Sequence, residues 1–223
     1  MIPFPEEPAR VRRVQVAPGA VHLPAWLCAD RQRRIVLACR GWARGPVPMH
    51  RTRLPGGGRM SVQSVDLGWH WQPYRYSRTA DDVNGARVAE LPEWLADLGR
   101  QAVAEAYQNP EAARGYRPDV ALVNFYDHNA RMGMHRDKEE RADEPVVSLS
   151  IGDRCVFRFG NTENRNRPWT DLELASGDAF VFGGPSRFAY HGVPRLYPGS
   201  GPSDTGLPAG RLNLTLRVTG LEG

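Results

Sequence analysis

From residue 120 onward, hydrophobic and polar side chains alternate with a period of two, in short stretches separated by turn residues. An extended chain places successive side chains on opposite faces, so each stretch is a predicted strand. The predicted strands are residues 120–126, 132–137, 146–151, 155–159, 171–174, 179–182, 188–191 and 211–218. Eight short strands with such turns predict a sandwich or a jelly roll.

Before residue 120 the pattern is mixed and predicts helices with one extended stretch. Residues 92–107 begin with proline and repeat apolar side chains at a helical period, which makes them the clearest predicted helix. A second helix is predicted over residues 23–41, with a glycine at its C-cap. Residues 60–77 alternate like a strand and end in an aromatic cluster, whereas residues 1–22 contain four prolines and are predicted to be an irregular arm.

Composition places the chain among ordinary globular proteins. Its 223 residues are 41% hydrophobic and 24% charged, enough for one domain with a sizeable core. The net charge of +4 permits a nucleic-acid partner without requiring one. Because Lys138 is the only lysine, we attribute the many arginines to codon bias and draw no functional conclusion from their number.

The cysteines and the N-terminus predict a protein of the cytoplasm. Cys28, Cys39 and Cys155 show no C-x-x-C spacing, and an odd number of cysteines without a metal pattern indicates free thiols in a reducing compartment. The N-terminus lacks the apolar run of a signal peptide, and no segment is long enough to span a bilayer. We therefore expect a cytoplasmic monomer without a membrane partner.

The strongest chemical pattern is His135-Arg136-Asp137. On an extended chain the imidazole and the carboxylate share a face, as in the 2-His-1-carboxylate triad that leaves positions open on ferrous iron. His191 is the best candidate for the third ligand. Taken alone, an H-x-D pattern is more often a surface histidine beside a solvated aspartate, and zinc takes similar ligands. The remaining histidines are interpreted as surface or packed residues, namely His22, His50, His70 and His128.

The last predicted strand, RLNLTLR at 211–217, alternates strictly. One face carries its two arginines with Asn213 and Thr215, and the other carries the leucines. A half-exposed strand with its polar face in water is one interpretation. Two arginines on one face also fit an acidic ligand, because a guanidinium group matches a carboxylate bidentately.

Seven segments between residues 124 and 217 resemble, in unchanged order, the AlkB-type iron(II)/2-oxoglutarate-dependent dioxygenases, which dealkylate nucleic acids. They are NFY at 124–126, HRDKEE at 135–140, PVVSLSIG at 145–152, FRFG at 157–160, SGD at 176–178, FGGPSRFAYHG at 182–192 and RLNLTLR at 211–217. The resemblance implies a mainly β protein with flanking helices. Residues 119–223 would form a double-stranded β-helix (jelly-roll) core, preceded by N-terminal helices and a nucleotide-recognition lid in residues 23–118.

The resemblance also implies roles for individual residues. His135, Asp137 and His191 would hold Fe(II) as the catalytic centre, where O2 and 2-oxoglutarate react. Arg211 would pair with the distal carboxylate of 2-oxoglutarate and Arg217 would lie nearer its metal-bound end. The other residues implied to bind the co-substrate are Asn124, Tyr126 and Asn213, and those implied to bind substrate are Trp69, Tyr76, Glu139 and Arg165. Of these, Trp69 would stack on the damaged base opposite His135.

The implied reaction is oxidative demethylation of N-alkylated bases, such as 1-methyladenine and 3-methylcytosine, with release of formaldehyde, succinate and CO2. The expected partner is single-stranded or double-stranded alkylated DNA, with RNA left open. One alternative keeps the chemistry but acts on a protein or a small molecule, which fold and iron chemistry alone do not exclude. The other alternative is a jelly-roll module that binds a metal without turnover.

Overall fold

Two antiparallel β-sheets face each other in the computed structural model, which describes residues 12–222. The large sheet has the strand order β1-β2-β11-β8-β13-β6-β3. Its strands are β1 (Val14–Ala17), β2 (Ala20–Leu23), β3 (Gln63–Leu67), β6 (Val120–Tyr126), β8 (Val146–Gly152), β11 (Ala179–Phe182) and β13 (Arg211–Arg217). The small sheet has the order β10-β9-β12-β7, with β7 (Met132–His135), β9 (Arg154–Gly160), β10 (Trp169–Leu174) and β12 (His191–Tyr197).

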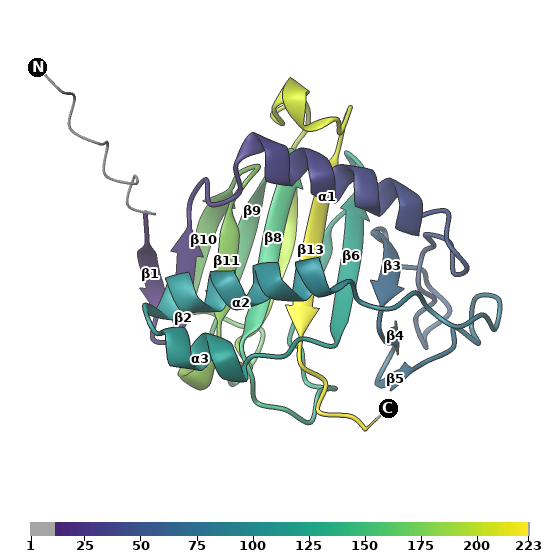
Figure 1. Cartoon of the computed structure of the whole chain (residues 1–223), viewed down its shortest axis with the longest axis horizontal. Helices are drawn as coiled ribbons and strands as arrows, with labels where there is room; N and C mark the ends of the chain where they lie inside the picture. Colours follow the sequence, from purple (N-terminus) through teal and green to yellow (C-terminus); the bar gives the residue numbers. More distant parts are fainter. Residues whose placement is uncertain (1–11, 223) are drawn as a thin grey trace, which may run out of the picture.

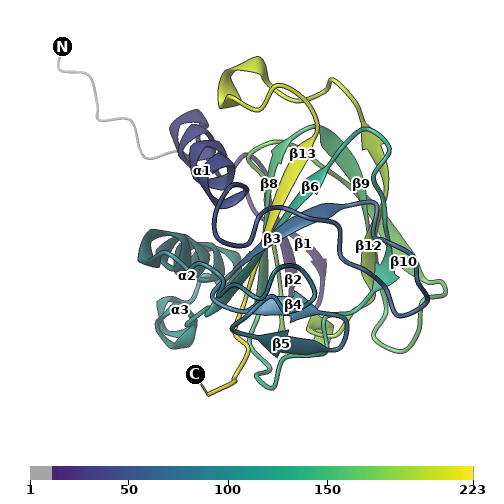
Figure 2. The same ribbon diagram turned by 90° about the vertical axis from the view of Figure 1, so that its right-hand side faces the viewer.

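Helices cover one face of the large sheet, and the small sheet covers the other (Figures 1 and 2). The helices are α1 (Ala29–Trp42), α2 (Glu93–Tyr107) and α3 (Pro110–Gly115). A short hairpin of β4 (His70–Gln72) and β5 (Arg75–Ser77) lies beyond β3 at the edge of the sheet. Four strands of the large sheet, β6, β8, β11 and β13, thus face the four strands of the small sheet, which confirms the predicted jelly roll.

The hydrophobic core lies in two layers. One layer packs α1 and α2 against the large sheet and includes Leu214 and Leu216 of β13. The other lies between the sheets and contains Phe157, Phe159 and Phe180. The leucines of β13 face the helices, so its polar residues face the space between the sheets, where the whole strand is buried. The interpretation of β13 as half exposed to water is therefore wrong.

Several predicted elements are confirmed, and others need correction. The helix at 92–107 and the strands at 120–126 and 179–182 form as expected. The part of the predicted N-terminal arm that the structure describes forms the β1–β2 hairpin, because β2 pairs with the edge of β11. Residues 1–11 lie outside the described residues.

The other corrections have the same origin in tertiary pairing. The helix predicted over 23–41 begins only at Ala29, since the residues before it are used by β2 and its connection. No strand forms at 188–190: a turn follows the 3-10 helix Gly184–Ser186, and β12 begins at His191. The extended stretch at 60–77 divides into three strands, and α3 was not predicted. Within residues 12–222, none of the helices has the length and apolar character needed to cross a lipid bilayer.

Candidate active site

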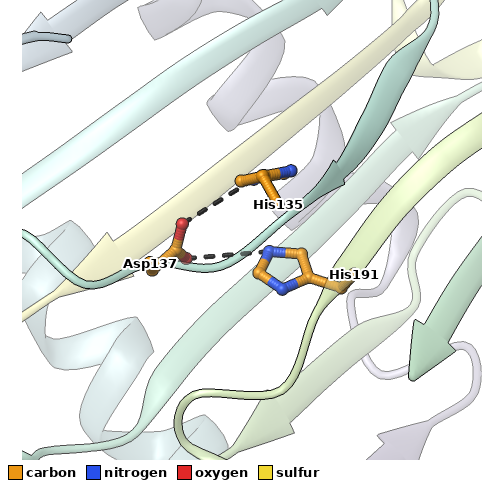
Figure 3. A group of neighbouring side chains, drawn as sticks. All are labelled: His135, Asp137 and His191. Carbon is orange, nitrogen blue, oxygen red and sulfur yellow. Dashed lines mark ion pairs between the residues drawn. The ribbon is translucent and has the colours of Figure 1, made fainter. Parts of the chain in front are cut away.

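Two histidines meet across the β7–β12 ladder. His135 is the last residue of β7, His191 is the first residue of β12, and the two are direct partners in the register. Their ring centroids are 4.5 Å apart. Asp137 follows β7 by two residues, and its carboxylate points to both imidazoles (Figure 3). Strand pairing thus brings together three residues that the sequence analysis selected.

The geometry of this group suits a metal ion. The Asp137 carboxylate oxygens lie 3.7 Å from Nε2 of His135 and 3.7 Å from Nε2 of His191. The Nδ1 atom of each histidine lies 3.0 Å from a backbone carbonyl oxygen, that of Gly133 or of Ala189. These contacts fix the ring orientation and leave both Nε2 atoms available as ligands. Within residues 12–222 no other cluster of histidine, cysteine and acidic residues has this metal-binding arrangement.

The protonation states also fit a metal. Burial raises the pKa of Asp137, but the charges of Arg217, His191, His135 and Arg187 together outweigh this effect and lower the pKa to about 2. Burial, with a smaller contribution from the nearby His135, lowers the pKa of His191 to about 4. At neutral pH the aspartate is therefore ionised and His191 is neutral, the forms that bind metals. One Asp137 oxygen, Oδ2, is buried without a hydrogen-bond donor, which a cation would supply.

A buried charge network holds Asp137 in place. The Arg217 guanidinium lies 2.8 Å from the Asp137 carboxylate and 3.0 Å from that of Glu140. Arg187 donates to the Asp137 carbonyl oxygen at 3.0 Å and to Glu140 at 3.2 Å. The Tyr76 hydroxyl donates to Glu140 and accepts from Arg217.

Sequence reasoning did not select Arg187 or Glu140. Both lie inside matched segments, FGGPSRFAYHG and HRDKEE, but a charged residue is ordinarily expected in water. Here both side chains are 0% exposed. Their place in the matched segments, close to the ligands in sequence, was the signal that could have identified them.

A cavity between the sheets is lined by two of the three ligands, His135 and His191. All five residues predicted to bind the co-substrate line it: Asn124, Tyr126, Arg211, Asn213 and Arg217. Arg211 is 1% exposed and donates from Nη2 to Ser150 at 2.9 Å, while its Nε and Nη1 atoms have no partner. An unpaired guanidinium edge in a buried cavity is the arrangement that a carboxylate ligand satisfies.

The other residues of the cavity differ in how many hydrogen bonds they already form. Asn213 already donates to Ser148 and to the carbonyl of Leu149. Tyr126 is buried, which raises the pKa of its hydroxyl, so at neutral pH it stays a hydrogen-bond donor. Phe157 and Phe182 form the apolar wall next to His191, with ring centroids 5.9 and 5.1 Å from it.

The residues predicted to contact substrate lie outside this cavity lining. Trp69 is 6% exposed, donates its indole N–H to Asp119, and has the Arg78 guanidinium 3.7 Å from its ring centre. Tyr76 is tied to the charge network, Glu139 is half-buried, and Arg165 is exposed in the loop after β9. Their roles stay predictions. Three of the other histidines lie apart from the metal group. His22 is beside Asp178, His70 lies between two aspartates, and the His50 ring is next to that of His70.

Comparison with known proteins gives a consistent result. The family model of the 2OG-Fe(II) oxygenase superfamily matches residues 19–217. A Caulobacter vibrioides alpha-ketoglutarate-dependent dioxygenase AlkB homolog is 38% identical, over 91% of this chain and 88% of that protein. The Arabidopsis thaliana DNA N(6)-methyladenine demethylase ALKBH1D is 32% identical over 91% of this chain, which spans 50% of that relative's length. The solved structure of OsALKBH1 matches with a TM-score of 0.81 and 30% identity, covering 92% of this chain and 99% of that one.

Replacing His135 by alanine is expected to abolish tight binding of a divalent cation and leave the fold intact. The side chain is 37% exposed, so its loss opens no deep cavity. Residues that only orient metal ligands are worth about 10- to 100-fold in metal affinity, so loss of a ligand should cost roughly 100-fold or more. Calorimetric titration with Mn(II) measures this. His128→Ala removes an exposed histidine outside the group and should bind like the wild type. Equal affinity of the two variants would contradict the assignment.

Proposed function

The chain belongs to the 2OG-Fe(II) oxygenase superfamily, among its AlkB-type dioxygenases, and we propose on this basis that it removes alkyl groups from nucleic-acid bases by oxidation. The observation that carries the proposal is one cavity lined by two of the metal ligands, His135 and His191, and by the partly unpaired Arg211, with the third ligand, Asp137, beside the two histidines. The choice of a nucleic-acid substrate is supported by the relatives, whose names describe AlkB homologues and DNA demethylases.

The residues of the cavity fit the cofactor and co-substrates of this family, which are Fe(II), 2-oxoglutarate and O2. Bound iron and 2-oxoglutarate would allow O2 to act as the oxidant: one oxygen atom goes to succinate as 2-oxoglutarate loses CO2, and the other converts an N-methyl group into an unstable hydroxymethyl adduct that releases formaldehyde. His135, Asp137 and His191 would hold the metal. They leave the rest of its coordination sphere open to the co-substrates.

The protein supplies binding, orientation and exclusion of water. Arg211 would donate from its unpaired Nε and Nη1 atoms to the distal carboxylate of 2-oxoglutarate. Arg217 would stay with Asp137 and Glu140, and so keep the aspartate ionised and correctly oriented. Asn124 and Tyr126 would complete the hydrogen bonds to the co-substrate, and the phenylalanines beside His191 would keep the cavity dry.

The two alternatives differ in measurable ways. A metal-binding module without turnover has no use for a buried guanidinium edge that lacks a partner, which weighs against that alternative. An oxygenase for a protein or a small molecule would share the cavity, so only a substrate assay separates it from a base dealkylase. Comparing the demethylation rates of single-stranded DNA, double-stranded DNA and RNA oligonucleotides in parallel assays would rank the nucleic-acid substrates.

The test of the proposed function is mass spectrometry of oligonucleotides that carry 1-methyladenine or 3-methylcytosine. Incubation with the protein, Fe(II) and 2-oxoglutarate should remove the methyl group and form at least one succinate per methyl lost, and His135→Ala should do neither. Succinate formation without loss of a methyl group from any oligonucleotide would favour the alternative substrate. Absence of both products would favour the module.

Replacing Arg211 by lysine should raise the KM for 2-oxoglutarate by roughly tenfold or more. A lysine keeps the charge but loses the planar fork, and one charge-assisted hydrogen bond is worth about 1.5–3 kcal/mol. Succinate formation as a function of 2-oxoglutarate concentration measures the effect. Arg114→Lys, an exposed change on α3, should leave this KM unaltered. The same KM in all three proteins would exclude Arg211 as the carboxylate-binding residue.

We also propose that Trp69 stacks on the everted base, although stacking would require one ring face to be uncovered. The Arg78 guanidinium, a planar cation, now lies over this ring and also donates to the carbonyl of Gly68. A methylated base is another planar cation and would gain the same cation–π attraction. The competing interpretation is that Trp69 is simply a core residue, packed near Val120 and Leu122.

Trp69→Ala should separate these two interpretations. Loss of a stacking aromatic costs about 1–3 kcal/mol per base, so affinity for a 1-methyladenine oligonucleotide should fall by roughly ten- to a hundredfold while substrate-free succinate production survives. Arg78→Ala, which uncovers the ring, should bind the same oligonucleotide at least as tightly as the wild type. If Trp69→Ala loses oligonucleotide binding, succinate production and its cooperative unfolding transition together, the core interpretation is correct.

A further inference from the structure

The outer face of the small sheet carries an unusual pattern of arginines and aromatic rings. Along β9 the residues Phe157 and Phe159 point into the core, while Arg154 and Arg158 alternate with them on the outer side. In the ladders, Arg158 is the partner of Asp171 on β10, and Arg154 is the partner of Tyr197 on β12. We define the arginine–aromatic face by six residues: Arg154, Arg158, Arg167, Trp169, Arg195 and Tyr197.

Each ring of this face contacts two guanidinium groups. The Trp169 ring centre lies 4.5 Å from the guanidinium carbon of Arg158 and 5.2 Å from that of Arg167. Tyr197 has the same relation to Arg195 at 4.8 Å and Arg154 at 5.5 Å. Rings and guanidinium planes thus form two stacks. The arginines that head the stacks on β9 are four residues apart, a distance of about 13 Å along a strand.

Ion pairing explains only half of this arrangement. Arg158 forms a two-pronged pair with Asp171 at 2.7 Å, and Arg154 pairs with Glu173 at 2.6 Å. Arg167 and Arg195 form no salt bridge with any residue in the described range 12–222. The hydrogen bonds from Arg158 and, less strongly, the charge of Arg167 lower the pKa of Asp171, but only Arg158 lies within ion-pair distance of it.

The positive charge continues toward the metal ligands. Arg136, between His135 and Asp137 in sequence, lies over the ring of Tyr190, the neighbour of His191, at 5.4 Å. Arg136 also donates to the carbonyl of Thr162, in the loop between β9 and β10. With Arg136 added, the face, this loop and β10 hold six arginines against three acidic residues: Arg136, Arg154, Arg158, Arg165, Arg167 and Arg195 against Glu163, Asp171 and Glu173. In Figure 2 the outer side of the small sheet lies opposite the helices, which cover the other layer.

We infer that the arginine–aromatic face is a docking surface for the single-stranded nucleic acid that flanks the modified base. Arginines neutralise phosphates, and planar guanidinium and indole groups stack on bases of any sequence. An acidic protein would use the arginines but not the alternating rings, so the combination favours nucleic acid. The inference rests on the proposed function and adds where the strand lies outside the cavity.

The position of the face sets a length dependence. A trinucleotide with a central modified base has only one nucleotide on either side of the cavity and occupies little of a sheet face. An oligonucleotide of about 15 nucleotides, near the upper end of the roughly 4–16 that single-strand sites span, can cover it. The face should therefore contribute to binding of the longer strand far more than to binding of the trinucleotide.

The test uses the full chain with both exposed, unpaired arginines reversed, Arg167→Glu with Arg195→Glu. The matched control is Arg31→Glu with Arg34→Glu on α1, two exposed arginines that lie over Trp26 and Trp94 at 5.9 and 4.7 Å. Net charge changes equally in both variants. Fluorescence anisotropy measures binding of fluorescein-labelled single strands of both lengths, each with one 1-methyladenine, over a series of salt concentrations.

The face variant should bind the longer strand at least tenfold more weakly, with a smaller decrease for the trinucleotide. Its slope of log affinity against log salt should be shallower by roughly 1.4, about 0.7 for each phosphate that the two arginines no longer neutralise. Trp169→Leu should weaken binding of the longer strand, and Trp169→Phe should restore it. Wild-type affinity of the face variant, or an equal decrease in the α1 control, would overturn the inference.

A separate readout distinguishes failure of the inference from failure of the proposed function. Demethylation of the trinucleotide by the wild-type protein depends far less on the face than binding of the longer strand does. If that reaction occurs and the face variant binds the longer strand normally, the inference fails and the function stands. If no oligonucleotide is demethylated, the function fails, and the anisotropy comparison still decides whether the face binds single strands.

Discussion

The position of the metal ligands depends on one buried group of charges, Arg187 and Arg217 with Asp137 and Glu140. Two positive and two negative side chains balance each other with almost no contact with water. Removing one partner from such a network typically costs about 3–5 kcal/mol, because the remaining charge stays buried and unpaired. The network joins β13, the segment after β7 and the turn before β12, which are far apart in sequence. The site can therefore form only when both sheets are in place, and Asp137 then has little freedom to turn away.

The same charge balance constrains what the cavity can bind. The network is neutral, and Arg211 adds one positive charge with an unpaired edge. A divalent cation alone would add two positive charges to a buried space, and the doubly charged anion 2-oxoglutarate alone would add two negative ones. Burial of an uncompensated charge is strongly unfavourable. With Arg211 counted, the cation alone would leave a net charge of +3, and the cation together with 2-oxoglutarate a net charge of +1. Electrostatics therefore favours binding of the cation with the anion over binding of the cation alone. The proposed co-substrate thus completes the metal site as well as reacting in it.

The sequence predicted features that form within one segment, such as side-chain alternation, better than features that depend on pairing between distant segments. Alternation in 211–217 correctly placed Arg211 and Arg217 on one face, but burial of that face depends on a second sheet about which the segment carries no information. The H-x-D pattern predicted that His135 and Asp137 share one side of the chain. The place of the third ligand, His191, depends on the register between β7 and β12. β2 was missed because its hydrogen bonds go to β11, a strand over 150 residues away in sequence. Arg187 and Glu140 were missed because nothing local distinguishes a buried charge from a solvated one.

The period of two that builds the jelly roll also separates the two tasks of the small sheet. On its inner side β9 presents Phe157, which packs near His191 and forms part of the apolar wall of the metal cavity. On its outer side the same strand presents Arg154 and Arg158. A polyanionic substrate needs positive charge nearby, but extra arginines inside the cavity would upset the balance that holds Asp137 and would compete with a metal ion. Alternation along a single strand avoids this conflict, because it places the arginines of the proposed phosphate-binding surface on the outer face of the sheet and keeps them away from the metal ligands on the inner face.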